Sequence, residues 1–193
     1  MPMQPTKPTR RSGLAACLVI AGLSLPLAAC TSSSTSTEQA ASSTRTQAAR
    51  EYWSVMAAIY PEIFPAAGGN GSFTACPAAG QVAYTIDNSI ASRGGRLAPG
   101  PFIAQVEQTL RSGGWSAFTP QGGDAVSTKD GYRIRLRRVT GSPSTMADLT
   151  LTGPCVTAGQ AFASAAPHMT LNDTYPDSEV SASPVPTSPL PSP

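Results

Sequence analysis

The sequence is poor in the side chains that carry metal and nucleophilic chemistry, with one histidine and four cysteines among 193 residues. Neither Cys76 nor Cys155 has a second ligand at zinc-site spacing, and His168 is far along the chain, so we expect no metal and no cofactor. A Ser-His-Asp triad would have to recruit His168 from a weakly patterned segment. Gly-x-Ser-x-Gly and Ser-x-x-Lys motifs are absent. We therefore expect no enzyme activity.

The positive charge of the whole chain comes from its first residues. Lys7, Arg10 and Arg11 supply three of the 13 basic residues, and all 11 acidic residues follow Cys30. The chain from Cys30 onward therefore has a net charge of −1. Because phosphate binding needs a persistent basic surface, we expect no nucleic-acid partner.

No apolar run reaches the ~20 residues that a membrane-spanning helix needs. The run Gly13 to Leu25 follows the basic residues and leads to Leu27-Ala28-Ala29-Cys30. Basic, apolar and small-residue regions in this order are typical of a secretory signal. A Cys after Ala29 is typical of a lipobox, which predicts cleavage before Cys30 and a diacylglycerol on the Cys30 thiol. The anchor would hold the protein on the outer face of the plasma membrane, with membrane lipid as its first partner.

The same tetrapeptide also occurs earlier, as Leu14-Ala15-Ala16-Cys17. Only Ser12 and Gly13 separate it from the arginine pair, so no apolar segment precedes it. We interpret Cys17 as an apolar residue of the signal core. The segment Thr9 to Leu14 also resembles a twin-arginine signal loosely, and ordinary secretion is the alternative.

Two cysteines remain beyond the lipobox, Cys76 and Cys155. An even pair outside the plasma membrane most often forms a disulfide. Free thiols are the alternative. Without Cys-x-x-Cys spacing, we expect the disulfide to be structural.

Composition divides the chain into four regions. Residues 1–29 are the signal peptide, and residues 30–46, rich in Ser and Thr, predict a flexible tether. Residues 47–160 predict the folded domain. Residues 161–193, which end in repeated prolines, predict a disordered tail for which a solvated spacer is the simplest interpretation.

Within the domain, apolar residues at helical spacing predict a helix over 47–60, ended by Pro61. Alternation predicts a strand over 82–86, and a second helix should run from Pro99 to a stop at Gly113-Gly114. The pair Asp130-Gly131 predicts a type I′ hairpin between strands 125–129 and 132–139, and a last strand covers 147–152. The stretch Gly68-Gly69-Asn70-Gly71 predicts a loop. These elements predict an α+β fold in which two helices pack on one face of a small antiparallel sheet.

Three arginines alternate with apolar residues on the second hairpin strand, so Arg133, Arg135 and Arg137 should share one sheet face. Such a row is a candidate site for an anionic ligand, for example a phosphorylated lipid headgroup or a cell-wall polymer. A solvated face whose charges discourage edge pairing is the alternative.

The chain resembles the small extracytoplasmic lipoproteins of actinobacteria (high-GC Gram-positive bacteria). The resemblance rests on Leu27 to Cys30, the Ser/Thr-rich segment after it, and three short stretches: Leu110 to Trp115, Lys129 to Tyr132, and Leu151 to Cys155. It implies a lipid-anchored, single-domain protein with one disulfide. It implies no catalytic residues.

These observations predict a lipid-anchored module of the cell envelope that binds a ligand, with a cell-wall component or an envelope protein as a further partner. A cell-envelope hydrolase with an unrecognised Ser or Asp site is the alternative. A lipid carrier is a third hypothesis, which a short domain with few bulky apolar residues disfavours.

Overall fold

A computed structural model describes residues 32–61, 63–65, 69–92, 99–139, 146–171, 173–175 and 190. The predicted signal peptide, with Ala29 and Cys30, and all but one residue of 176–193 lie outside the described residues. The helices are α1 (Ser32–Ile59), α2 (Pro99–Ser112), α3 (Gln160–Ala165) and the 3-10 helix η2 (Ala166–His168). The strands are β1 (Ile63–Pro65), β2 (Gly69–Ala75), β3 (Gln81–Ser92), β4 (Thr119–Gln121), β5 (Asp124–Lys129), β6 (Tyr132–Arg138), β7 (Met146–Thr152), β8 (Val156–Thr157) and β9 (Thr174–Tyr175).

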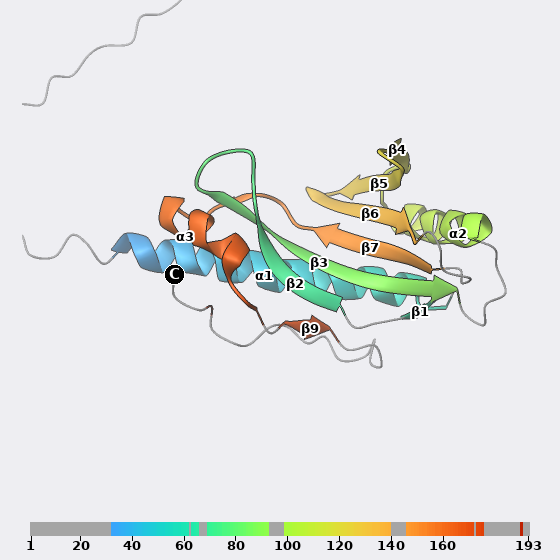
Figure 1. Ribbon diagram of the computed structural model, residues 1–193, viewed down its shortest axis with the longest axis horizontal. Helices are drawn as coiled ribbons and strands as arrows, with labels where there is room; N and C mark the ends of the chain where they lie inside the picture. The colour runs from blue at the N-terminus through green and yellow to red at the C-terminus, as the bar shows by residue number, and fades with distance from the viewer. Residues whose placement is uncertain are drawn as a thin grey trace, which may run out of the picture. The chain divides into compact units, whose positions relative to one another are not determined.

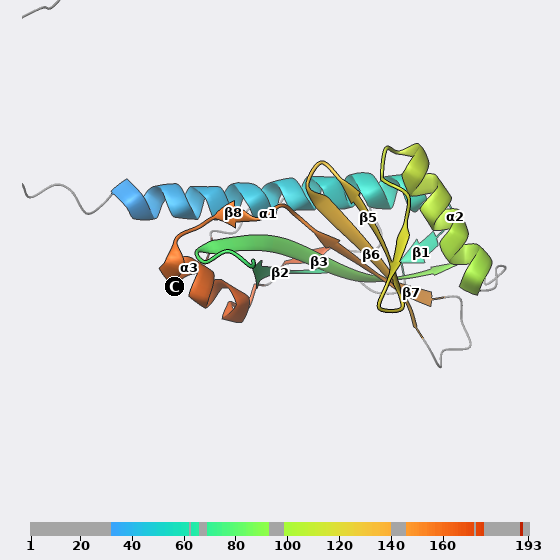
Figure 2. The same cartoon turned by 90° about the horizontal axis from the view of Figure 1, so that it is seen from above.

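The strands form one antiparallel sheet in the order β4-β5-β6-β7-β3-β2-β9, and β1 and β8 also pair with β3. The long helix α1 runs along the sheet, and α2 lies beside the β4–β5 end (Figures 1 and 2). Buried side chains from both helices join one cluster with the inward residues of β3, β6 and β7. The predicted α+β fold, with an antiparallel sheet and two helices on one face, is therefore confirmed.

The prediction of a flexible tether over 30–46 is wrong for its described residues, 32–46, because α1 begins at Ser32. Its buried stripe continues toward the N-terminus through Ala48, Thr44 and Ala41, at the same helical spacing as the aromatic residues further along. Small side chains in this stripe let the helix backbone lie close to the sheet. Packing against the sheet therefore stabilises a segment whose composition alone does not favour burial.

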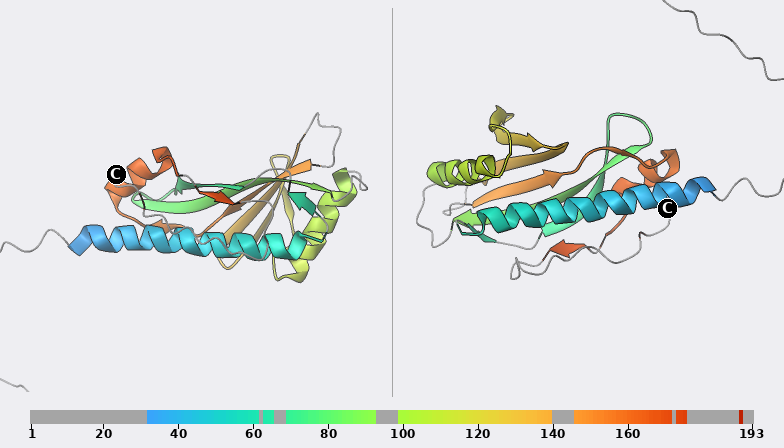
Figure 3. Two further views of the ribbon diagram at one scale, coloured as in Figure 1. Left: turned by 90° about the horizontal axis from the view of Figure 1, so that it is seen from below. Right: turned by 180° about the vertical axis from the view of Figure 1, so that it is seen from behind.

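The predicted disordered tail over 161–193 is wrong in its first part, and the folded domain is larger than 47–160. The segment after Cys155 forms α3 and η2, and β9 then pairs with β2 and becomes the edge strand of the sheet. Phe162 and Ala166 are buried there, and the Phe162 ring packs edge-on against Phe73 at a centroid distance of 5.4 Å. Figure 3 shows α3 close to one end of β3. A few well-placed apolar residues thus order a segment of polar average composition.

The glycine-rich stretch predicted as a loop begins a strand, because β2 starts at Gly69. A Cβ atom at Gly71 would overlap the hydroxyl group of Tyr84 on the neighbouring strand β3, where Tyr84 pairs with Phe73, two residues further along β2. This glycine therefore provides space for a buried tyrosine. At this position glycine allows the Tyr84 side chain to lie close to the backbone of β2, and it does not form a turn.

Two turn predictions are confirmed. Asp130 and Gly131 both have positive φ, 50° and 83°, as a type I′ hairpin turn requires. Helix α2 ends at Ser112, and Gly114 follows with φ of 90°. At both places the backbone needs a positive φ, which favours glycine. A short sequence pattern is therefore sufficient to predict these two turns.

Candidate functional site

The three predicted arginines share the sheet face that points away from α1 and α2. Arg133, Arg135 and Arg137 alternate on β6 with the inward residues Ile134 and Leu136, both of which are buried. The register places Thr152, Thr150 and Asp148 of β7 opposite the arginines, one to each. The prediction that the row occupies one face is confirmed.

Each arginine of the row has a partner within the protein. Asp124, at the start of β5, forms ion pairs with Arg135 and Arg137 at 3.5 Å and 3.2 Å. The hydrogen bond from Arg137 to Asp124 raises the pKa of the Arg137 guanidinium. Arg133 donates to the side-chain oxygen of Gln121 on β4. The sequence analysis did not identify these partners. Asp124 and Gln121 lie on the strands β5 and β4, where no repeated pattern of acidic or amide residues marks them.

Acidic residues further along the same face balance the arginines. Asp148 accepts a hydrogen bond from Ser89 at 2.9 Å, and Asp87 accepts one from Thr150 at 2.6 Å. With Asp124, the face carries three carboxylates for three guanidinium groups. It is therefore a mixed-charge surface, and anion binding by the row stays a prediction.

Arg138 lies on the opposite face from the row, because alternation on β6 places it with Ile134 and Leu136. The guanidinium lies near the start of α2, where a Cβ built on Gly100 would be 3.8 Å from it. Arg138 lines a cavity of about 330 Å³ between α2 and the β4–β5 hairpin. The apolar residues of its lining include Ile103, Phe118 and Leu136.

The cavity also holds a carboxyl group in partly apolar surroundings. Glu107 projects from α2 toward the same cavity. Desolvation raises the pKa of the Glu107 carboxyl, and the positive charges of Arg111 and Arg138 oppose part of this rise. The cavity therefore combines an apolar lining with the guanidinium of Arg138 and the carboxyl groups of Glu107 and Asp124, which is the composition of a small-molecule site. The sequence analysis missed this site, although the alternation on β6 already separates Arg138 from the row.

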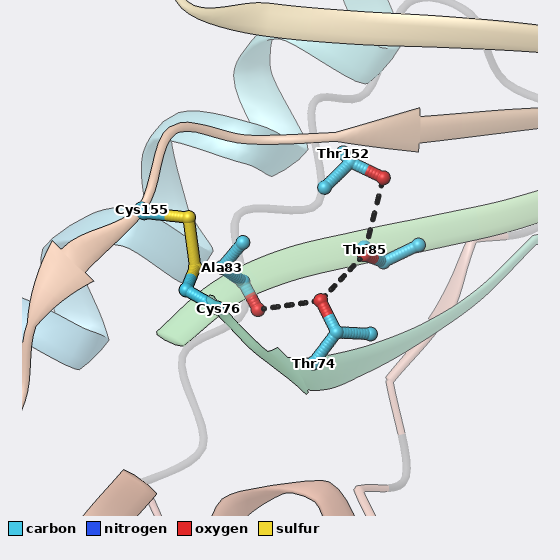
Figure 4. The surroundings of a disulfide bond; sticks show 6 residues. All are labelled: Thr74, Cys76, Ala83, Thr85, Thr152 and Cys155. Atoms are coloured by element: carbon cyan, nitrogen blue, oxygen red, sulfur yellow. Dashed lines mark hydrogen bonds between the residues drawn. A yellow bond between two sulfur atoms is a disulfide. The ribbon is translucent and has the colours of Figure 1, made fainter. Parts of the chain in front are cut away.

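The Cys76–Cys155 disulfide is present, as predicted. Cys76 lies in the turn between β2 and β3, and Cys155 follows β7 (Figure 4). Beside it, Thr74 is within hydrogen-bonding distance of Thr85 at 3.2 Å, and Thr85 donates to Thr152 at 3.3 Å, so hydroxyl groups bridge three neighbouring strands. The bond joins the β2–β3 turn to the end of β7. A disulfide that joins two parts of one sheet, beside hydroxyl groups that bridge its strands, is typical of a structural cross-link.

A buried charged network that the sequence analysis missed connects helix α1 with the segment just before β9. Arg45 of α1 pairs with Asp173, just before β9, and the two side chains are only 4% and 7% exposed. The hydroxyl of Tyr84 donates to the same carboxylate. Every group in the network is satisfied by another, so it serves to hold the C-terminal segment on the domain.

The groups that a hydrolase would need are dispersed. Ser89 is paired with Asp148 on the mixed-charge face, whereas His168 is exposed in η2. Asp130 occupies the hairpin turn. Among the described residues, no cluster of three or more His, Cys, Asp or Glu side chains is arranged to hold a metal ion.

No helix in the described part of the chain is long and apolar enough to cross a membrane. No protein-family model, no curated protein and no solved structure matches this chain.

Proposed function

We propose that the protein is a lipid-anchored module of the cell envelope that binds a small ligand and catalyses no reaction of its own. The observation that carries the binding role is the cavity between α2 and the β4–β5 hairpin, which combines an apolar lining with Glu107 and Arg138. Its volume, about 330 Å³, is at the small end of the range for ligand sites. That size favours a compact ligand and disfavours a carrier of diacyl lipid.

The proposed location has two independent supports. The lipobox Leu27 to Cys30 follows a complete basic and apolar leader. The disulfide between Cys76 and Cys155 fits an oxidising compartment outside the plasma membrane. A membrane lipid attached at Cys30 would be the first partner, and a cell-wall or envelope component the second.

Fractionation of cells that express Cys30→Ala tests the anchor, with Cys17→Ala as a matched control in the same tetrapeptide. We expect Cys30→Ala to leave the protein unprocessed or to release it from membranes, and Cys17→Ala to behave as wild type. If Cys30→Ala is processed and sediments as wild type does, the anchor is wrong.

The hydrolase alternative rests on the Ser89–Asp148 pair, the Ser–Asp contact on the mixed-charge sheet face. Incubating the purified protein with peptidoglycan fragments and ester substrates distinguishes the two functions. We expect no turnover above that of Ser89→Ala. Turnover that Ser89→Ala or Asp148→Asn abolishes would replace the proposed function with a hydrolase.

A further inference from the structure

Glu107 and Arg138 place opposite charges at one cavity without pairing with each other. Neither side chain forms an ion pair or a hydrogen bond with the described residues. Their charges do interact at longer range, since Arg138 opposes the rise in the Glu107 pKa. Both groups are thus available to a ligand that lies between them.

The third charged group at the cavity is already neutralised. Asp124 lines the cavity, but its carboxylate pairs with Arg135 and Arg137 from the other side of the sheet. The remaining charges are one carboxylate and one guanidinium. A simple anion would leave Glu107, which is partly desolvated, with only the longer-range charge of Arg111 to balance it, and a simple cation would leave Arg138 without a partner.

The apolar residues of the lining indicate which kind of group a ligand would carry besides its charges. Ile103, Phe118 and Leu136 offer aliphatic and aromatic surface. An apolar side chain that displaces water from this surface would contribute binding energy roughly in proportion to the area buried. The two charged groups would then fix the orientation of the ligand.

We propose that the cavity binds a small zwitterion with an apolar body, namely an apolar amino acid or a short peptide with free termini. The ligand ammonium would lie at Glu107 and its carboxylate at Arg138. Arginine suits this role because its planar guanidinium matches a carboxylate with two parallel hydrogen bonds. This inference rests on the proposed binding function and names its ligand class.

The experiment measures binding to the full-length protein in detergent by isothermal titration calorimetry. The probes are leucine, leucyl-leucine, N-acetyl-leucyl-leucine and leucyl-leucine amide. We expect at least one zwitterion to bind, and blocking either terminus to weaken binding at least about tenfold, because each modification removes one charge-assisted contact. The stronger of leucine and leucyl-leucine then identifies the source as a free amino acid or a peptide.

Variants assign each end of the ligand to its residue. We expect Glu107→Gln to weaken binding of the zwitterion at least about tenfold but to change binding of its N-acetyl form much less. We expect Arg138→Gln to weaken binding of the zwitterion by a similar factor and to change binding of leucyl-leucine amide much less. Arg133→Gln is the matched control, because it removes an exposed arginine from the same strand on the opposite sheet face, and we expect it to bind as wild type.

The inference is overturned if neither zwitterion binds, if the blocked forms bind as tightly as the free ones, or if Arg133→Gln weakens binding as much as Arg138→Gln. The blocked probes test the wild-type protein, so the result does not depend on how the variants fold. Failure of binding with intact membrane anchoring would refute the ligand class and leave the proposed location in place. Hydrolysis of leucyl-leucine during the titration would instead contradict the non-catalytic role while supporting the ligand class.

Discussion

Arg45 and Asp173 form a buried ion pair although they lie 128 positions apart in the sequence. The Arg45 Nε donates to Asp173 Oδ2 at 2.6 Å, and Tyr84 shares the carboxylate. One carboxylate therefore connects the first helix, the longest strand and the C-terminal segment. The contact makes residues 173–175 part of the folded domain.

We expect Asp173→Ala to destabilise the protein by roughly 3–5 kcal/mol, because it leaves the Arg45 guanidinium buried without a counter-charge. Chemical denaturation of the purified protein measures this loss. The double variant Arg45→Met with Asp173→Leu is the control, since apolar residues can replace a buried pair at little cost. Stability of Asp173→Ala within about 1 kcal/mol of wild type would mean that the ion pair is not formed in solution.

Local patterns in the sequence predicted the elements whose limits depend on local chemistry. The Asp130-Gly131 hairpin and the stop of α2 at Gly113-Gly114 are of this kind. The Cys76–Cys155 bridge was also predictable, because these are the two cysteines that follow Cys30 in the sequence.

Predictions failed where a distant segment determines the local structure. The N-terminal half of α1 is helical because Ala41, Thr44 and Arg45 meet the sheet and Asp173, and none of these contacts is visible in its composition. The cavity was missed for a related reason. Glu107 lies on α2, Phe118 lies in the loop before β4, and Arg138 ends β6, so only the fold brings them together.

Reduction of the disulfide should lower the melting temperature of the protein. The bridge closes a loop between residues 79 positions apart, and loss of such a cross-link typically costs roughly 2–5 kcal/mol. For a domain of this size, that loss corresponds to about 5–15 °C. Calorimetry with and without a reducing agent measures the change, with Cys76→Ser/Cys155→Ser as the control that no longer responds. An unchanged melting temperature on reduction would show that the bridge does not stabilise the domain.

Removal of Asp124 should expose the arginine row to anions. We expect Asp124→Asn to bind inorganic phosphate several-fold more tightly than wild type, because Arg135 and Arg137 both lose their counter-charge. Equilibrium dialysis at constant ionic strength measures the affinity. Asp130→Asn, in the exposed hairpin turn, is the matched control. Equal phosphate affinity in all three proteins would contradict the neutralising role assigned to Asp124.

Glu107 should make stability depend on pH in a defined direction. Its pKa is raised in the folded protein above the ordinary value of 4.5, so the folded state holds the proton more tightly than the unfolded state. The stabilising contribution of the protonated form is present below the unfolded value and is lost as the pH rises through the folded value. We therefore expect Glu107→Gln to be more stable than wild type at neutral pH. Its stability should also fall less than that of wild type as the pH rises above 4.5. A pH series of melting temperatures checks this, and a decline of equal size in both proteins would contradict it.

The most direct test of the account is the intact mass of the protein extracted from the membrane fraction of its native cells. We predict a mature chain that begins at Cys30 and carries the added mass of a thioether-linked diacylglycerol on that residue. An unlipidated chain that still contains the leader, recovered from the cytosol, would contradict the anchor and the envelope role that depends on it.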